Sequence, residues 1–170
     1  MSDEFFRIGT RDLPVQWHAN GKFEQLVDGT LDRCFDGTLI RKQPLAMVLK
    51  GLRRVDITMA GPGTMISEKA RSIFERGGFS GWRTFPIKLK TKRSLKEKFF
   101  GLVVTGRTPV IGDIFQKPER IKKKNWDGSD FFLLKDGERV TGVTVVTKRV
   151  VEAAQRAGLS GAVFHPIVAE

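Results

Sequence analysis

Two stretches of this chain follow one pattern: SEKARSIFERGGFSGWRTFPI at residues 67–87 and TKRVVEAAQRAGLSGAVFHPI at residues 147–167. They align without a gap, and six of the twenty-one positions are identical, among them two glycines and a proline. Backbone geometry rather than reactivity dictates where glycine and proline are used. The repeat therefore describes architecture, and we use it as the starting point for predicting the fold.

Each copy of the repeat predicts a short helix. Ser67 and Thr147 have side-chain oxygens that can cap a helix start. Apolar residues follow at helical spacing on one face, and Gly78 and Gly158 favour a left-handed residue at the helix end. The residues of these apolar faces are Ala70, Ile73 and Phe74 in the first copy, and Val150, Val151 and Ala154 in the second.

A strand is expected after each helix. Pro86 and Pro166 cannot donate to a β-ladder, so these strands are predicted at a sheet edge or a bulge. Residues 99–115 are rich in β-branched and aromatic residues and form the strongest strand candidate. Residues 131–147 read as two strands joined at Asp136-Gly137.

The first part of the chain is less regular. Residues 1–37 carry short apolar pieces separated by Asn-Gly and Asp-Gly dipeptides, which predict a small hairpin or meander. Residues 45–54 fit a helix or a strand equally well, and residues 55–59 alternate as a strand does. We predict one α+β domain over 1–170, mainly antiparallel sheet with two short helices from the repeat: a strand and turn region at 1–50 and a core at 55–170.

Composition excludes several classes of protein. No run of about eighteen apolar residues suggests a membrane span. The acidic opening MSDEFF is unlike a secretory signal, so we expect a cytoplasmic protein with no membrane partner. Cys34 is the only cysteine, which excludes an intrachain disulfide and a cysteine-based metal site.

The residues that catalysis needs are sparse. His18 and His165 are the only histidines, and no HExxH spacing or GxxxxGK[ST] motif occurs. The segment AGPGTMIS at 60–67 favours a strand-to-helix connection over an anion site, and Asp127 and Asp130 favour a turn over a paired-carboxylate site. We therefore expect a protein that is not an enzyme, with no catalytic residues, no metal and no cofactor.

Positive charge is concentrated in the middle of the chain. The net charge is +11, and residues 41–124 hold 21 Lys and Arg against 6 Asp and Glu. Two segments, 88–98 and 117–124, carry most of the excess, which predicts an acidic partner. The predicted partner-binding residues are Lys88, Lys90, Lys92, Arg93, Lys96, Arg120, Lys122, Lys123, Lys124 and Trp126.

Several phrases resemble a known family. GPGTMISEKARSIFERGGFSGWRTFPIKL, FFGLVVTGR, NWDGSDFF and VTKRVVEAAQRAGLSGAVFHPI are similar to small bacterial proteins allied to the immunity proteins of polymorphic toxin systems, over roughly residues 55–170. Their shared signature is a hydroxyl residue, a short helix and a G-[LF]-[ST]-G step into a strand with proline. It brings no catalytic residues to carry over.

The resemblance implies a cytoplasmic immunity protein that binds and blocks a cognate toxin. Many immunity proteins are acidic, whereas this chain is basic, so the contact surface of its toxin is expected to be acidic. An alternative remains open, because charge alone does not separate a protein partner from a nucleic acid. In that reading, the same basic face of an accessory protein binds phosphates without reading sequence.

Overall fold

The structure, a computed structural model, describes residues 4–10, 18–20, 30–40, 42, 44–50, 54–60, 63–90, 97–113 and 119–170. Its elements are, in chain order, β1 (Phe5–Thr10), β2 (His18–Asn20), α1 (Thr30–Phe35), β3 (Leu45–Lys50), β4 (Ile57–Ala60), β5 (Gly63–Ser67), α2 (Glu68–Arg76), β6 (Trp82–Lys90), β7 (Phe99–Val104), β8 (Gly106–Pro109), β9 (Arg120–Ile121), the 3-10 helix η1 (Lys123–Asn125), β10 (Phe131–Asp136), β11 (Arg139–Thr147), α3 (Lys148–Arg156), β12 (Ala162–Pro166) and β13 (Val168–Ala169).

A closed barrel forms the first unit of the fold. Its strands follow the order β2-β3-β6-β7-β5-β4, and α2 connects β5 to β6. The pairs β3 with β6 and β2 with β4 are parallel, and the other neighbours are antiparallel. We call β2 to β7, with α1 and α2, the first unit.

The second unit repeats this arrangement. A five-stranded sheet has the order β12-β1-β11-β10-β8, and β13 pairs with β9 in parallel. An antiparallel bridge between Val110 and Ile121 links the end of β8 to β9. It corresponds to the antiparallel pairing of β2 with β3 in the first unit. Each pair of neighbours has the same relative direction as its counterpart in the barrel. We call β1 and β8 to β13, with α3, the second unit.

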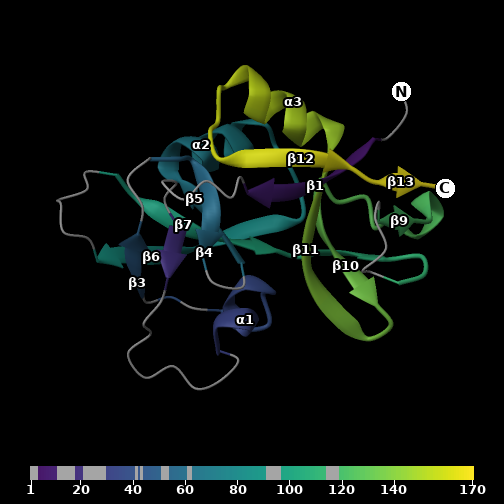
Figure 1. Cartoon of the computed structure of the whole chain (residues 1–170), viewed down its shortest axis with the longest axis horizontal. Coiled ribbons are helices and arrows are strands. Elements are labelled where there is room, and N and C mark those ends of the chain that lie inside the picture. The colour runs from purple at the N-terminus through teal and green to yellow at the C-terminus, as the bar shows by residue number, and fades with distance from the viewer. Residues whose placement is uncertain are drawn as a thin grey trace.

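Strand β1 joins the second unit although it comes first in the chain (Figure 1). It lies between β11 and β12, as β7 lies between β5 and β6. The registers match: Phe5 pairs with Thr147 as Phe99 pairs with Ser67. The first unit is therefore contiguous in sequence, whereas the second receives one of its central strands from the beginning of the described chain.

Three apolar clusters fill this fold. The first lies inside the barrel and includes Met47, Phe85 and Phe99. Another, around Phe5 and Phe132, fills the second unit. The third lies between the units and beneath both helices, which lie close together in Figure 1. Burial of this third cluster joins the two units into one packed body.

Several sequence predictions are confirmed. The α+β class holds, since two helices of nine residues accompany mostly antiparallel sheets. The helices end before Gly78 and Gly158, whose φ angles are 61° and 60°. The turn at Asp136-Gly137 joins β10 to β11 as predicted, and the segment at 45–50, left open between helix and strand, is a strand.

Other predictions were wrong. The strands β1 and β2 do not pair with each other, because each is bound between strands from elsewhere in the chain. Pro86 does not lie on an edge strand, since β6 has neighbours on both sides; β3 pairs only from Ile87 onward, so the proline precedes that ladder. β12, which contains Pro166, does lie at a sheet edge.

The two helix starts also differ. Ser67 accepts a hydrogen bond from the amide of Ala70, as predicted. Thr147 makes no such side-chain cap, which corrects the prediction; its hydroxyl donates instead to Asp130, at 2.8 Å. The segment at 60–67 contains a β-hairpin between β4 and β5, not a direct strand-to-helix loop.

Candidate functional site

The predicted basic residues fall into two groups that lie far apart. Lys88 is exposed near the end of β6, whereas Arg120 and Lys122 to Lys124 are exposed on β9 and η1. Figure 1 shows β6 and β9 on opposite sides of the molecule. The described residues do not include Lys92, Arg93 and Lys96, and for Lys90 the description does not extend to the side chain. The structure therefore does not unite the two segments in one face through the residues it describes.

The group on β9 and η1 is the denser one. We call Arg120, Lys122, Lys123 and Lys124 the β9–η1 basic segment; all four side chains are exposed. Arg120 forms an ion pair with Glu170, which offsets part of its charge. Lys122, Lys123 and Lys124 follow in consecutive positions and are exposed, so the segment presents a local concentration of basic residues.

Backbone hydrogen bonds hold this segment in place. The amide of Val168 donates to Glu119 at 2.9 Å, and the amide of Lys123 donates to the carbonyl of Glu170 at 2.8 Å. Ile121, in the middle of the segment, is fully buried in the second unit. The lysines therefore project from an anchored backbone.

Trp126 has a structural part in this region. Its indole Nε1 donates to the carbonyl of Ser129 at 2.9 Å. The ring packs edge-on against Phe5, with centroids 5.0 Å apart. Trp126 is only partly exposed, so a small part of its side chain is available to a partner beside the lysines.

Two buried carboxylates were missed by the sequence analysis as interacting groups. Asp56 accepts hydrogen bonds from the hydroxyl of Ser67 at 2.9 Å and from the amide and hydroxyl of Ser160 at 3.0 and 2.9 Å. In the second unit, Asp130 accepts from Thr147 at 2.8 Å and from the amide of Ser80 at 3.1 Å. Each carboxylate thus binds its own unit's helix start and the serine of the other unit.

The electrostatics of Asp56 follow from these contacts. Burial raises the pKa of its carboxyl, but the hydrogen bonds from Ser160 and Ser67, together with nearby Lys69, outweigh that effect. The net result is a pKa below the usual value. Asp56 is therefore ionised at neutral pH and serves as a hydrogen-bond acceptor at the junction of the two units.

The aspartate pair considered in the sequence analysis, Asp127 and Asp130, forms a turn as predicted. Asp127 accepts a hydrogen bond from the amide of Ser129 at 2.9 Å, which is an Asx-turn contact, and another from the amide of Arg107 at 2.6 Å. Gly128 follows with a φ of 83°. Asp127 is exposed and Asp130 is buried, so the two carboxylates occupy different surroundings.

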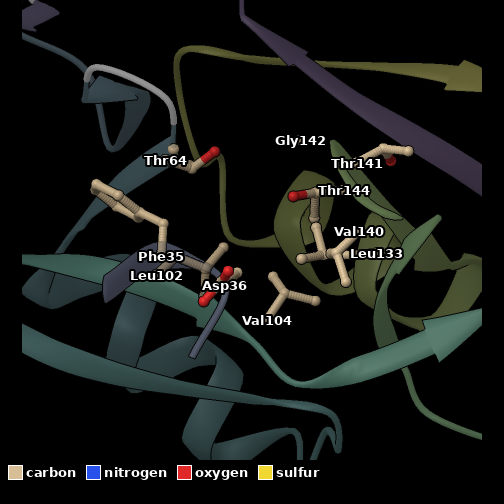
Figure 2. Close-up of a pocket in the computed structure, with 11 residues that line it drawn as sticks. Phe35, Asp36, Thr64, Leu102, Val104, Leu133, Val140, Thr141, Gly142 and Thr144 are labelled. Carbon is tan, nitrogen blue, oxygen red and sulfur yellow. The ribbon is translucent and has the colours of Figure 1, made fainter. Parts of the chain in front are cut away.

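A small cavity of about 100 Å³ lies between the units (Figure 2). Thr64 on β5 and Thr144 on β11, each three residues before its copy of the repeat, line opposite sides of it. Leu133 and Leu102 contribute apolar surface, and Asp36 lies at its side. The volume corresponds to about three water molecules, so it suits only a very small ligand.

Two of the polar side chains around this cavity, Asp36 and Thr141, form hydrogen bonds within the protein. Asp36 accepts two hydrogen bonds from Thr38, at 2.8 and 2.7 Å, and Thr141 donates to the carbonyl of Leu134 at 2.7 Å. These contacts give the Asp36 and Thr141 side chains a structural role at the cavity. Within the described ranges, no three His, Cys, Asp or Glu side chains come close enough together to hold a metal ion.

The two histidines and the cysteine are not gathered into one site by the described residues. Cys34 is fully buried in the barrel cluster, as a small apolar residue would be. His165 is exposed on β12, and the side chain of His18 lies outside the description. No helix in the described parts of the chain is long and apolar enough to cross a membrane.

Comparison with known proteins adds no relative. The chain matches no model of a protein family, and no curated protein is similar to it in sequence.

Proposed function

We propose that this chain is a non-enzymatic cytoplasmic immunity protein that binds and inhibits a toxin through the β9–η1 basic segment. The observation that carries the proposal is the group of exposed lysines on a backbone anchored to the core of the second unit. The resemblance of residues 55–170 to immunity proteins of polymorphic toxin systems supplies the class of partner. Charge complementarity requires that the toxin's contact surface be acidic.

The proposed segment suits fast and specific association. Exposed lysines draw an acidic surface over a distance of about 10 Å at moderate salt. Close contact would then involve the exposed part of Trp126, because a partly buried aromatic ring loses little freedom on binding. Lys88 lies apart from this segment and is proposed as a separate, weaker contact at most.

Charge reversal tests the proposal. We expect K122E/K123E/K124E to slow association with the toxin encoded beside this protein by about tenfold or more at low salt. Because all three side chains are exposed, the free energy of unfolding should change by less than about 0.5 kcal/mol. Association rates from surface plasmon resonance and urea denaturation measure the two effects.

A matched control separates local from overall charge. R33E/R76E/R139E changes the net charge equally, but its exposed side chains lie on α1, α2 and the start of β11. It should leave the association rate close to that of the native protein. Equal slowing by both triple variants would show that the segment has no particular role.

The alternative is a nucleic-acid-binding accessory protein that uses the same segment. The exposed lysines favour it, since they could neutralise phosphates without reading sequence. It predicts binding to a random DNA duplex that weakens steeply as salt rises. Binding at physiological salt that is lost in K122E/K123E/K124E would favour this alternative over the toxin inhibitor.

A further inference from the structure

The two units differ chemically at three matched positions. The registers place Arg7 opposite His165 where the first unit has Gly101 opposite Phe85. Since β9 pairs with β13 as β3 pairs with β6, Glu119 occupies the place of Leu45. The first unit fills these positions with apolar groups: a β-carbon on Gly101 would lie 2.2 Å from the ring of Phe85, which is itself buried. The second unit holds three ionisable groups there.

Two of these groups form an ion pair, and the third lies beside them on the same face of the sheet. The Nε of Arg7 lies 3.5 Å from a carboxylate oxygen of Glu119, whose side chain is only 2% exposed. The ring of His165 lies over Gly9, on the same face of β1 as Arg7. Arg7 is partly exposed and His165 is exposed, so the open side of the cluster faces solvent.

Stability alone does not account for such a cluster. A buried charge loses its hydration, and apolar residues of similar volume commonly serve as well or better at such positions. The first unit shows that this backbone accepts an apolar set, since Leu45 is as buried as Glu119. A buried carboxylate such as Glu119, kept against that cost, is a candidate for a functional site.

A second observation concerns hydrogen bonding. Among the described residues, the buried side-chain atoms that lack a hydrogen-bond partner are Arg7 Nε and Thr108 Oγ1. Both belong to the second unit and point to the same face of its sheet. Arg7 lies two residues after Phe5 on β1, and Thr108 is paired with Leu134. Phe5 and Leu134 both belong to the apolar cluster that fills this unit. Unpartnered buried polar groups are rare in proteins, and a bound ion or water is one of the explanations for them.

We propose that Arg7 and His165 form an oxyanion-binding site, with Glu119 as the positioning residue. Glu119 approaches the guanidinium from its Nε side, which leaves the terminal nitrogens to bind the two oxygens of a carboxylate or phosphate. His165 supplies a further ring N–H donor. Glu119 offsets the charge of Arg7, and the lysines that follow it, Lys122 to Lys124, restore a positive potential, whereas the charge of Arg120 is paired with Glu170. The site requires no particular toxin, and it goes beyond the proposed function.

Nuclear magnetic resonance on the intact, ¹⁵N-labelled chain tests this site. Sodium phosphate and sodium acetate are titrated separately, each against sodium chloride at equal ionic strength. For ligands this small we expect millimolar affinity, seen as saturable shifts of the Arg7 Nε–H signal and the β12 amides. Tighter binding of phosphate assigns the natural ligand to phosphate esters, and tighter binding of acetate assigns it to carboxylates.

Three variants identify the groups responsible. R7K keeps the charge but loses the planar fork, and should weaken binding by about tenfold. H165F introduces the ring found at the matched position of the first unit, so it should fold and bind about threefold or more weakly. R120Q, on the neighbouring strand, is the control and should bind as the native protein does.

The role of Glu119 has its own readout. E119Q keeps the side-chain shape but weakens the hold on Arg7, so the Arg7 Nε proton should exchange faster and the preference between the two anions should fall. If Glu119 were purely structural, the preference between the two anions would be unchanged. Shifts that fail to saturate beyond the chloride control, or equal losses in R7K and R120Q, would overturn the site and leave the toxin-binding proposal untouched.

Discussion

Replacing Gly161 by alanine is expected to destabilise the protein by about 4 kcal/mol, a large part of the stability of an ordinary domain. Gly161 has a φ of 95°, and a β-carbon there would lie 2.1 Å from the carbonyl oxygen of Ile57. Neither backbone segment can move easily, because hydrogen bonds between Ser160 and Asp56 hold the two segments together at this point. The free energy of unfolding from urea denaturation measures the loss.

A matched control isolates the close contact from the backbone conformation. Gly158 also has a positive φ, of 60°, but nothing lies within 4 Å of its would-be β-carbon. Gly158→Ala should therefore cost only about 1 kcal/mol. Gly81→Ala, whose β-carbon would lie 2.2 Å from the oxygen of Phe131, should resemble Gly161→Ala. Equal costs at positions 158 and 161 would contradict this account of the junction.

Replacing Asp56 by alanine is the second large change. It removes the acceptor for the amide of Ser160 and for two serine hydroxyls in a buried setting, and should cost about 3 kcal/mol. Asp36→Ala is the control: Asp36 also accepts two hydrogen bonds, but in an exposed loop, and should cost less than about 1 kcal/mol. Similar losses of unfolding free energy in the two variants would mean that burial does not increase the contribution of the Asp56 hydrogen bonds.

The same carboxylate predicts a dependence on pH. Its folded-state pKa lies below the unfolded-state value of about 4. A lowered pKa gives stability that is present above the unfolded value and is lost as pH falls through the folded one. Acid should therefore weaken the native protein as pH drops below about 4, and Asp56→Asn should show a shallower decline. Urea denaturation at several pH values from about 6 to 2 measures the two slopes.

The repeat made both helices predictable from the sequence. Their apolar faces, glycine ends and following strands are local features, and local pattern decides them. The wider duplication was not visible in the sequence for a physical reason. The hairpin of the second unit is six residues longer than that of the first, so Asp56 precedes its helix cap by 11 residues and Asp130 by 17. Equivalent carboxylates therefore fall out of alignment.

Strand pairing was the other limit of the sequence analysis. The turn-forming dipeptides in residues 1–37 favour a local hairpin, but the partners of β1 are β11 and β12, more than a hundred residues away. Burial of Phe5 against Phe132 and Trp126 outweighs that local preference. The basic residues raise the same difficulty, because a sequence shows the charge of each segment but not the side of the folded molecule on which the segment lies.

The position of β1 has a consequence for the order in which the protein is made. The first unit is complete in sequence once β7 has been synthesised, whereas β1 is made before β2 and its two neighbours are made after β10. During synthesis this strand must remain unpaired while β2 to β10 are translated, and closing so long a loop is slow. The second unit can form only after translation reaches β12, so a strand made before the first unit completes a unit that forms after it.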